Sequence, residues 1–252
     1  MATVQSEVGR IRIFEDFLGP EYIIAETSTT GGTLGGFRVV GDGITETDSG
    51  IVILESDGLS GVAQLTTADD ASEDSCGLVT AKCFDAALMG TLVAETRVRF
   101  DDDDNKAFFF GFCDENDDDQ GIEGEIMAGA TETLTLTASD ICGFYFTDEL
   151  TTDPSDWHMV YKGGTTTGET DSTEVNADDD IAAGEFQILR VEVDPNGTAR
   201  WYIDGVLKQT VEGAMSTSTD VAVVFIVETK TAAAETAEVD YILVEANRDW
   251  TV

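Results

Sequence analysis

The sequence predicts an all-β chain that folds as a two-sheet antiparallel β-sandwich. Residues 189–193 (LRVEV) alternate strictly between apolar and charged side chains, as a strand with one buried face requires. Residues 194–197 (DPNG) and 204–205 (DG) supply turn signals that fit tight hairpins. A helical period is absent except at 180–183, which is too short for more than a single turn.

Apolar runs predict strands along the whole chain. In order they cover residues 11–14, 37–40, 51–54, 61–65, 92–100, 107–112, 143–146, 158–161, 188–193, 200–203, 206–211, 221–227 and 239–244. The glycine- and threonine-rich tract at 162–170 predicts an exposed loop between two of them. With 3 prolines and no linker-like segment, the chain is expected to have a short N-terminal arm (1–13) and one sandwich domain (14–252).

The charge of the chain is extreme. There are 51 acidic and 13 basic residues, which gives a formal net charge of −38, while hydrophobic residues still make up 42%. Such a surface repels nucleic acid and anionic membranes, so neither is expected as a partner. Runs of aspartate at 101–104, 117–119 and 178–180 lie between apolar runs, where hairpin loops are expected.

Two further patterns indicate the cellular compartment in which the chain is made. No apolar stretch is long enough to span a bilayer, and residues 1–7 lack the pattern of a secretory signal, so we expect synthesis in the cytoplasm without export. Four scattered cysteines without a C-x-x-C pair are interpreted as reduced, apolar strand residues, although a loop staple between Cys76 and Cys83 is left open.

A resemblance adds to this interpretation at the C-terminal strands. Residues 186–194, Gly197 and 200–205 resemble the central hairpin of concanavalin-like and laminin-G-like jelly-roll sandwiches. Residues 239–244 are similar to the closing strand of that fold. In such a sandwich Trp201 and Ile203 would fill the core between the sheets.

A second resemblance concerns function. Residues 14–19, 95–100, 108–112 and 240–248 are similar to segments of structural proteins of tailed bacteriophages. This implies a non-enzymatic capsid decoration (cement) protein that binds the major capsid protein on the outside of the virion, as a homotrimer. The alternative is a glycan-binding module of a fibre or cell surface, with Trp157 and Tyr161 as candidate sugar contacts.

Catalysis is not expected. Glucanases of the concanavalin-like fold need three acids on one strand, as E-x-D-x-x-E. The nearest stretch, residues 115–120, ends in Gln120, and Glu123 and Glu125 have no third acid in register. The only histidine, His158, has no serine or cysteine nucleophile motif to serve.

Two sets of residues are candidate sites. Calcium favours carboxylate oxygens, so Asp102, Asp104, Asp114 and Asp117 are candidate ligands of a structural calcium, with solvated loop charges as the alternative. No other cofactor is expected. Arg10, Arg12 and Trp250 are candidate contacts to the capsid or to a neighbouring subunit, and the alternative for the two arginines is a first strand that exposes them.

Overall fold

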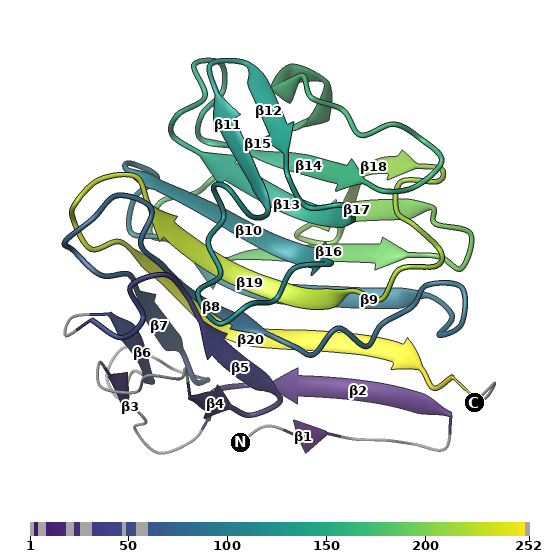
Figure 1. Cartoon of the computed structure of the whole chain (residues 1–252), viewed down its shortest axis with the longest axis horizontal. Coiled ribbons are helices and arrows are strands. Elements are labelled where there is room, and N and C mark those ends of the chain that lie inside the picture. The colour runs from purple at the N-terminus through teal and green to yellow at the C-terminus, as the bar shows by residue number, and fades with distance from the viewer. Residues whose placement is uncertain are drawn as a thin grey trace.

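The chain folds into two large antiparallel sheets that stack face to face (Figure 1). The computed structural model describes residues 3–4, 9–18, 23–25, 32–46, 49–53 and 60–249. Within them the chain is nearly all strand, with one short 3-10 turn. This confirms the predicted jelly-roll sandwich.

The first sheet, sheet A, has the strand order β18-β17-β16-β9-β20-β7-β6-β3, with β2 also paired to β20 and β1 to β2. Its strands are β1 (Thr3–Val4), β2 (Arg10–Glu15), β3 (Ile23–Ala25), β6 (Gly50–Ile53), β7 (Ala63–Thr66), β9 (Leu92–Arg99), β16 (Gln187–Val193), β17 (Ala199–Ile203), β18 (Val206–Val211) and β20 (Thr236–Asn247).

The second sheet, sheet B, has the order β15-β14-β13-β10-β19-β8-β5-β4. Its strands are β4 (Thr33–Leu34), β5 (Phe37–Val40), β8 (Ser75–Val79), β10 (Lys106–Cys113), β13 (Ile141–Thr147), β14 (Asp156–Lys162), β15 (Asn176–Asp180) and β19 (Ala222–Thr229). A separate hairpin of β11 (Met127–Ala130) and β12 (Thr133–Leu136) stands at the top of the view in Figure 1. The 3-10 turn η1 (Ser172–Val175) precedes β15.

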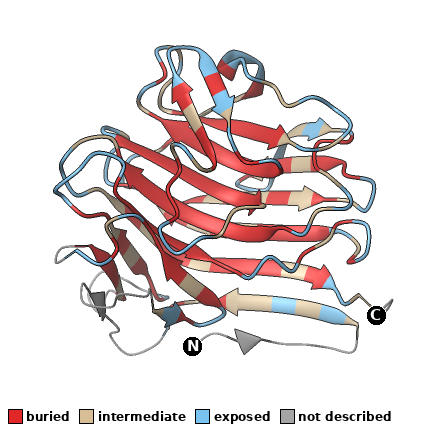
Figure 2. Cartoon of the chain, viewed as in Figure 1, coloured by how far each residue is buried: buried red, intermediate tan, exposed pale blue. Residues whose placement is uncertain are grey.

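The two sheets differ in how their strands are buried. In sheet A, β16 alternates between buried and half-buried residues, as its sequence predicts. In sheet B, β10, β13 and β19 are buried at every residue, and Figure 2 shows them red along their lengths. Sheet A therefore has one open face, whereas the central strands of sheet B are covered on both faces.

The core between the sheets is aromatic. Trp157 of β14 packs against the rings of Phe108 and Phe146, with centroid distances of 5.8 and 5.5 Å. From sheet A, the indole of Trp201 donates a hydrogen bond of 2.8 Å to the carbonyl oxygen of Gly143 in sheet B. Trp201 and Ile203 are both buried, which confirms their predicted place in the core.

The hairpin turns also follow the prediction. Gly197 has a φ of +78°, and Asp204 and Gly205 have φ of +49° and +78°. Backbone angles of this sign are those for which asparagine, aspartate and glycine are favoured in tight turns.

Three expectations from the sequence are corrected. The aspartates at 178–180 lie in strand β15, not in a loop, because β15 is an edge strand and tolerates outward charges. The helical turn forms at Ser172–Val175 and not at 180–183, because Asp171 caps it by accepting a hydrogen bond of 3.0 Å from the amide of Thr173. Residues 10–13, assigned to an arm, lie within β2, which pairs with β20.

The outer face of sheet B is covered by the chain between β10 and β13. The carbonyl oxygen of Asp118 accepts a hydrogen bond of 3.0 Å from the amide of Gly41, next to β5. The carbonyl oxygen of Gln120 accepts one of 2.7 Å from the hydroxyl of Ser75 in β8. The amide of Glu123 donates one of 2.9 Å to Glu228 in β19. We call residues 114–140 the covering segment.

Candidate functional site

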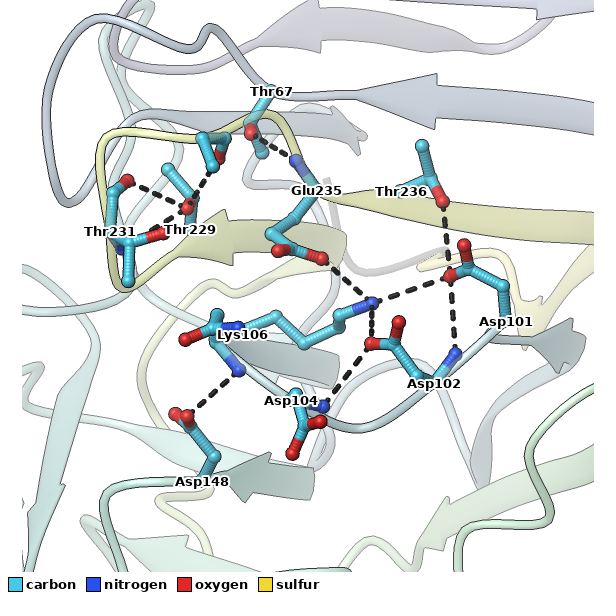
Figure 3. A network of polar contacts seen from close by, with 12 residues as sticks. Thr67, Asp101, Asp102, Asp104, Lys106, Asp148, Thr229, Thr231, Glu235 and Thr236 are labelled. Carbon is cyan, nitrogen blue, oxygen red and sulfur yellow. Dashed lines mark hydrogen bonds and ion pairs between the residues drawn. The ribbon is translucent and has the colours of Figure 1, made fainter.

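Asp102, the first predicted calcium ligand, binds a lysine. The side chain of Lys106 is fully buried at the start of β10, and its Nζ lies 2.9 Å from Asp102 Oδ1 and 2.8 Å from Glu235 Oε2 (Figure 3). Asp101 Oδ1 lies 3.4 Å from the same nitrogen. Burial opposes the ammonium charge, but the bonds to Glu235 and Asp102 outweigh it and raise the pKa of Lys106. Much of the acidic run at 101–104 is thus organised around an internal cation.

Asp104 takes part in the turn and not in the ion pair. Its backbone amide donates a hydrogen bond of 3.2 Å to Asp102 Oδ1, which shapes the loop between β9 and β10. The next amide, that of Asn105, donates one of 2.8 Å to Asp148, which ties this loop to the end of β13.

The other two predicted ligands lie at the opposite end of β10. Asp114 Oδ1 accepts a hydrogen bond of 2.9 Å from the amide of Asp140, and the amide of Asp117 donates one of 3.0 Å to Gln120 Oε1. An eight-residue strand separates the two pairs by roughly 25 Å, so the four aspartates do not form one site. In the part of the chain that the structure describes, no group of three or more His, Cys, Asp or Glu side chains is arranged to hold a metal ion.

A polar groove of about 550 Å³ lies beside Asp117, between the covering segment and strands β5 and β8. Arg38 lines it and binds both the carboxylate of Asp118 and the carbonyl oxygen of Asn116. The guanidinium therefore already has its partners within the groove.

A buried charge cluster fixes the covering segment to sheet B. Glu228 is fully buried, and its carboxylate accepts hydrogen bonds from the amides of Ile122 and Glu123. The ammonium of Lys230, with 5% of its side chain exposed, lies 3.1 Å from both Glu228 and Glu149 and also binds Glu123. Burial raises the pKa of Glu228, and the neighbouring Lys230 ammonium and the two amides oppose that rise.

A larger groove, of about 620 Å³, lies between β12 and the loop that follows β14. We call it the threonine groove. Its lining consists of Thr133, Leu134, Thr135, Leu136, Ser139, Lys162, Gly163, Gly164, Thr166, Thr167, Gly168 and Thr170. Lys162 Nζ donates a hydrogen bond of 2.7 Å to the carbonyl oxygen of Leu136, so the two walls are tied at one end. Five of its threonines and Ser139 are exposed, and the hydroxyl of Thr166 donates a hydrogen bond of 2.6 Å to the carbonyl oxygen of Glu212.

The remaining candidates fall in different places. Arg12 lies on the outer face of sheet A, with its Nε 3.1 Å from Glu245 Oε1, and Arg10 is exposed on the same strand. Both therefore belong to strand β2, which exposes them. Trp250 lies outside the described residues. Trp157 and Tyr161, the candidate sugar contacts, are 0% and 8% exposed, so core packing accounts for them.

The cysteines are not paired, and the acids considered for catalysis are bound by other groups of the protein. All four cysteines are free, and only Cys83 is exposed. Glu125 accepts a hydrogen bond of 3.1 Å from the amide of Gly121, and Glu123 is bound by Lys230. No helix among the described residues is long and apolar enough to cross a membrane.

Comparison with known proteins identifies the fold alone. No family model and no curated protein matches the sequence. Among solved structures, a protein of unknown function from Shewanella oneidensis superposes with a TM-score of 0.61 at 13% identity, covering 99% of this chain and 92% of that one. The carbohydrate recognition domain of Emp46p gives 0.51 at 10% identity, covering 88% and 95%. A conserved carbohydrate esterase from the Shiga toxin-encoding bacteriophage phi24B gives 0.50 at 16%, covering 91% and 100%.

The residues that organise these sites were not predicted from the sequence. Lys106 and Lys230 are buried lysines at the ends of apolar strands, and a lysine beside a run of acids at a strand end is a pattern that could have indicated internal ion pairs. The threonine groove had a weaker signal. Its loop was correctly predicted as exposed, but β12 was not predicted at all.

Proposed function

We propose that this chain is a non-catalytic module that binds a neutral glycan in the threonine groove. The groove is the observation that supports the proposal. It offers threonine hydroxyl groups beside the half-buried side chain of Leu136, and sugars present hydroxyl groups and C–H faces in the same way. The fold is consistent with this, since solved structures that share it include a carbohydrate recognition domain and a carbohydrate esterase.

The charge of the chain restricts the ligand. A net charge of −38 repels sulfated, phosphorylated or uronic-acid polymers, so the preferred glycan is uncharged. The groove has a volume suited to one or two sugar rings, and its described lining includes no aromatic side chain for stacking. Affinity at one groove is therefore expected to be weak, and useful binding would come from several copies together.

The absence of turnover is part of the proposal. Glu123 and Glu125, the alternating acids considered for catalysis, are held by Lys230 and by the amide of Gly121. An acid already committed to a buried ammonium is poorly placed to act as a nucleophile or proton donor toward a sugar.

The test is a screen of neutral polysaccharides by affinity electrophoresis, followed by titration of the best ligand. Thr135→Trp fills the groove from an exposed position on β12, whereas Thr217→Trp places the same ring on an exposed loop outside the groove. We expect the first substitution to abolish retardation and the second to leave it unchanged. Equal binding by both variants, or release of reducing sugar by the native chain, would contradict the proposal.

A second candidate, decoration of a capsid exterior, is favoured by one different observation. The covering segment closes the outer face of sheet B and is bonded to β5, β8 and β19, which makes the domain a rigid block and not an open cleft. A rigid block can bridge neighbouring capsid subunits through many weak contacts, on the outside of a virion.

Co-sedimentation with expanded capsid shells that lack this chain tests the second candidate. Saturation at many copies per shell, with greater resistance to heat, is expected of a cement protein. No binding to shells would refute this role and leave the glycan proposal in place.

A further inference from the structure

On one face of this strongly acidic molecule, the described basic and acidic side chains are equal in number. It is the outer face of sheet A, where β2, β20, β9, β16 and β17 lie side by side. In β9, β16 and β17 its arginines and carboxylates alternate with buried core residues. The arginines are Arg10, Arg12, Arg97, Arg99, Arg190 and Arg200, and the carboxylates are Glu95, Glu192, Asp194, Glu238, Asp240 and Glu245. We call this surface the arginine face.

The balance on this face contrasts with the rest of the chain. The face contains six of the 13 basic and six of the 51 acidic residues, so the formal excess of 38 negative charges lies elsewhere. All six carboxylates are paired with an arginine of the same face. Two copies that approach each other through their acidic surfaces are repelled, whereas two copies that approach through the arginine face are not.

The residue types are those of a protein interface. Six of the eight arginines of the chain lie on this face, and none of its five lysines does. Protein interfaces are enriched in arginine and aromatic residues and depleted in lysine. The arginine face also holds four half-buried aromatic rings, those of Phe14, Tyr202, Tyr241 and Phe186.

The aromatic and cationic groups are already ordered. Phe186 lies under two guanidinium groups, with Arg97 and Arg99 4.2 and 4.6 Å from its ring centroid. Phe14 and Tyr241 pack with centroids 5.8 Å apart. Because these side chains are fixed by their neighbours, docking a partner on them costs little conformational entropy.

The size of the face suits a dimer. Six adjacent strands, including β18, span about 29 Å across, and seven residues span about 23 Å along each strand. The projected area of roughly 650 Å² approaches the ~800 Å² that each partner buries in a standard interface. At its margin Leu207, opposite Tyr202 in the register of β17 and β18, adds an apolar side chain that is 50% exposed.

We infer that the arginine face is the site at which a second copy of this chain docks, related by a two-fold axis. The acids Glu238, Asp240 and Glu245 lie along β20, and Arg97 and Arg99 lie along the neighbouring β9. A two-fold axis along the boundary of these strands places the acidic column of each copy against the arginine column of the other. The threonine groove belongs to the sheet B side, so it stays open in this dimer, and the inference does not depend on glycan binding.

The test is sedimentation velocity from about 1 to about 100 µM at about 0.5 M sodium chloride, where screening limits long-range repulsion between acidic copies. Arg97→Glu reverses a charge on the face, and Arg38→Glu is its matched control. The two arginines are 36% and 38% exposed and each pairs with one aspartate, but only Arg97 lies on the arginine face. Leu207→Ser and Leu88→Ser form an uncharged pair, at 50% and 49% exposure.

We expect a dimer that Arg97→Glu weakens at least about tenfold and Leu207→Ser about threefold, while both controls dimerise as the native chain does. Thermal unfolding of all four variants, measured alongside, verifies that each is folded. A native chain that stays monomeric over this range, a trimer, or a dimer weakened equally by Arg38→Glu would overturn the inference.

Discussion

The outer faces of the two sheets differ in whether their charged side chains are buried or exposed to water. On sheet B the covering segment buries the face, and the charges left there, Glu228 and Lys230, must be neutralised inside the protein. On sheet A the face is open, and pairs such as Arg12 and Glu245 keep contact with water. The difference indicates where ion pairs contribute most to stability. A buried charge that loses its partner has no water to stabilise it, whereas an exposed charge is still solvated.

The largest expected effect follows from removing the cation on the covered side. Lys230→Met leaves the buried carboxylate of Glu228 without its ammonium and should lower the free energy of unfolding by about 3–5 kcal/mol. Urea denaturation measures this loss. The matched change Lys208→Met removes a lysine that is 21% exposed and has one partner, Asp179 at 2.6 Å, and should cost less than about 1 kcal/mol.

A double variant sharpens this result. Adding Glu228→Gln to Lys230→Met removes the stranded charge and should restore part of the lost stability, since uncharged replacement of both partners is often tolerated. Similar losses for Lys230→Met and Lys208→Met would mean that burial does not determine how much an ion pair contributes to stability.

Lowering the pH should test a second buried titratable group of sheet B. The ring of His158 is fully buried in β14, and burial lowers its pKa from 6.5 to about 4. The unfolded chain therefore takes up a proton before the folded chain does. The contribution of His158 is complete above pH 6.5 and falls by about 3 kcal/mol as the pH drops to 4.

A comparison with His158→Phe isolates this contribution. Asp74 and Asp156 act in the opposite direction, because burial raises their pKa to about 6 and the folded chain takes up their protons first. The difference in unfolding free energy between native chain and variant, measured from pH 7 to 4, removes those common terms. A difference that does not change with pH would contradict the buried neutral imidazole.

The smallest effect is expected at the loop that joins the two sheets between β9 and β10. Asp101, Asp102 and Glu235 already bind the ammonium of Lys106, and the described residues include no group arranged to hold a metal ion. Millimolar calcium or a chelator should therefore shift the melting temperature by less than about 1 °C. A saturable rise of several degrees would instead support a calcium site in the acidic loops.

The same contrast explains what the sequence could predict. Alternation of apolar and charged residues indicates a strand with one solvent-exposed face, so β16 was predicted closely. The turn at Asp204 was predicted from its Asp-Gly pair. The apolar run of β10 also predicted a strand, but not which chain segment covers it. That segment is polar and irregular, and its contacts, such as Ser75 with Gln120, join residues far apart in the sequence.

The site was less predictable than the fold. A run of aspartates indicates a strong negative charge, but whether calcium or a lysine neutralises it depends on which strand ends meet in space. Glu235, which completes the Lys106 cluster, comes from the far end of the chain. The charge balance of the arginine face is equally hidden, because its residues are spread over five strands from β2 to β20.

The position of β20 has a consequence for how the chain is made. This last described strand lies inside sheet A, where it pairs with β2, β7 and β9. Until the ribosome has released it, those three strands have no shared neighbour and expose unpaired edges. Folding of this sandwich must therefore wait until β20 has been synthesised, and a chain cut short before residue 236 would aggregate instead of forming a smaller sandwich.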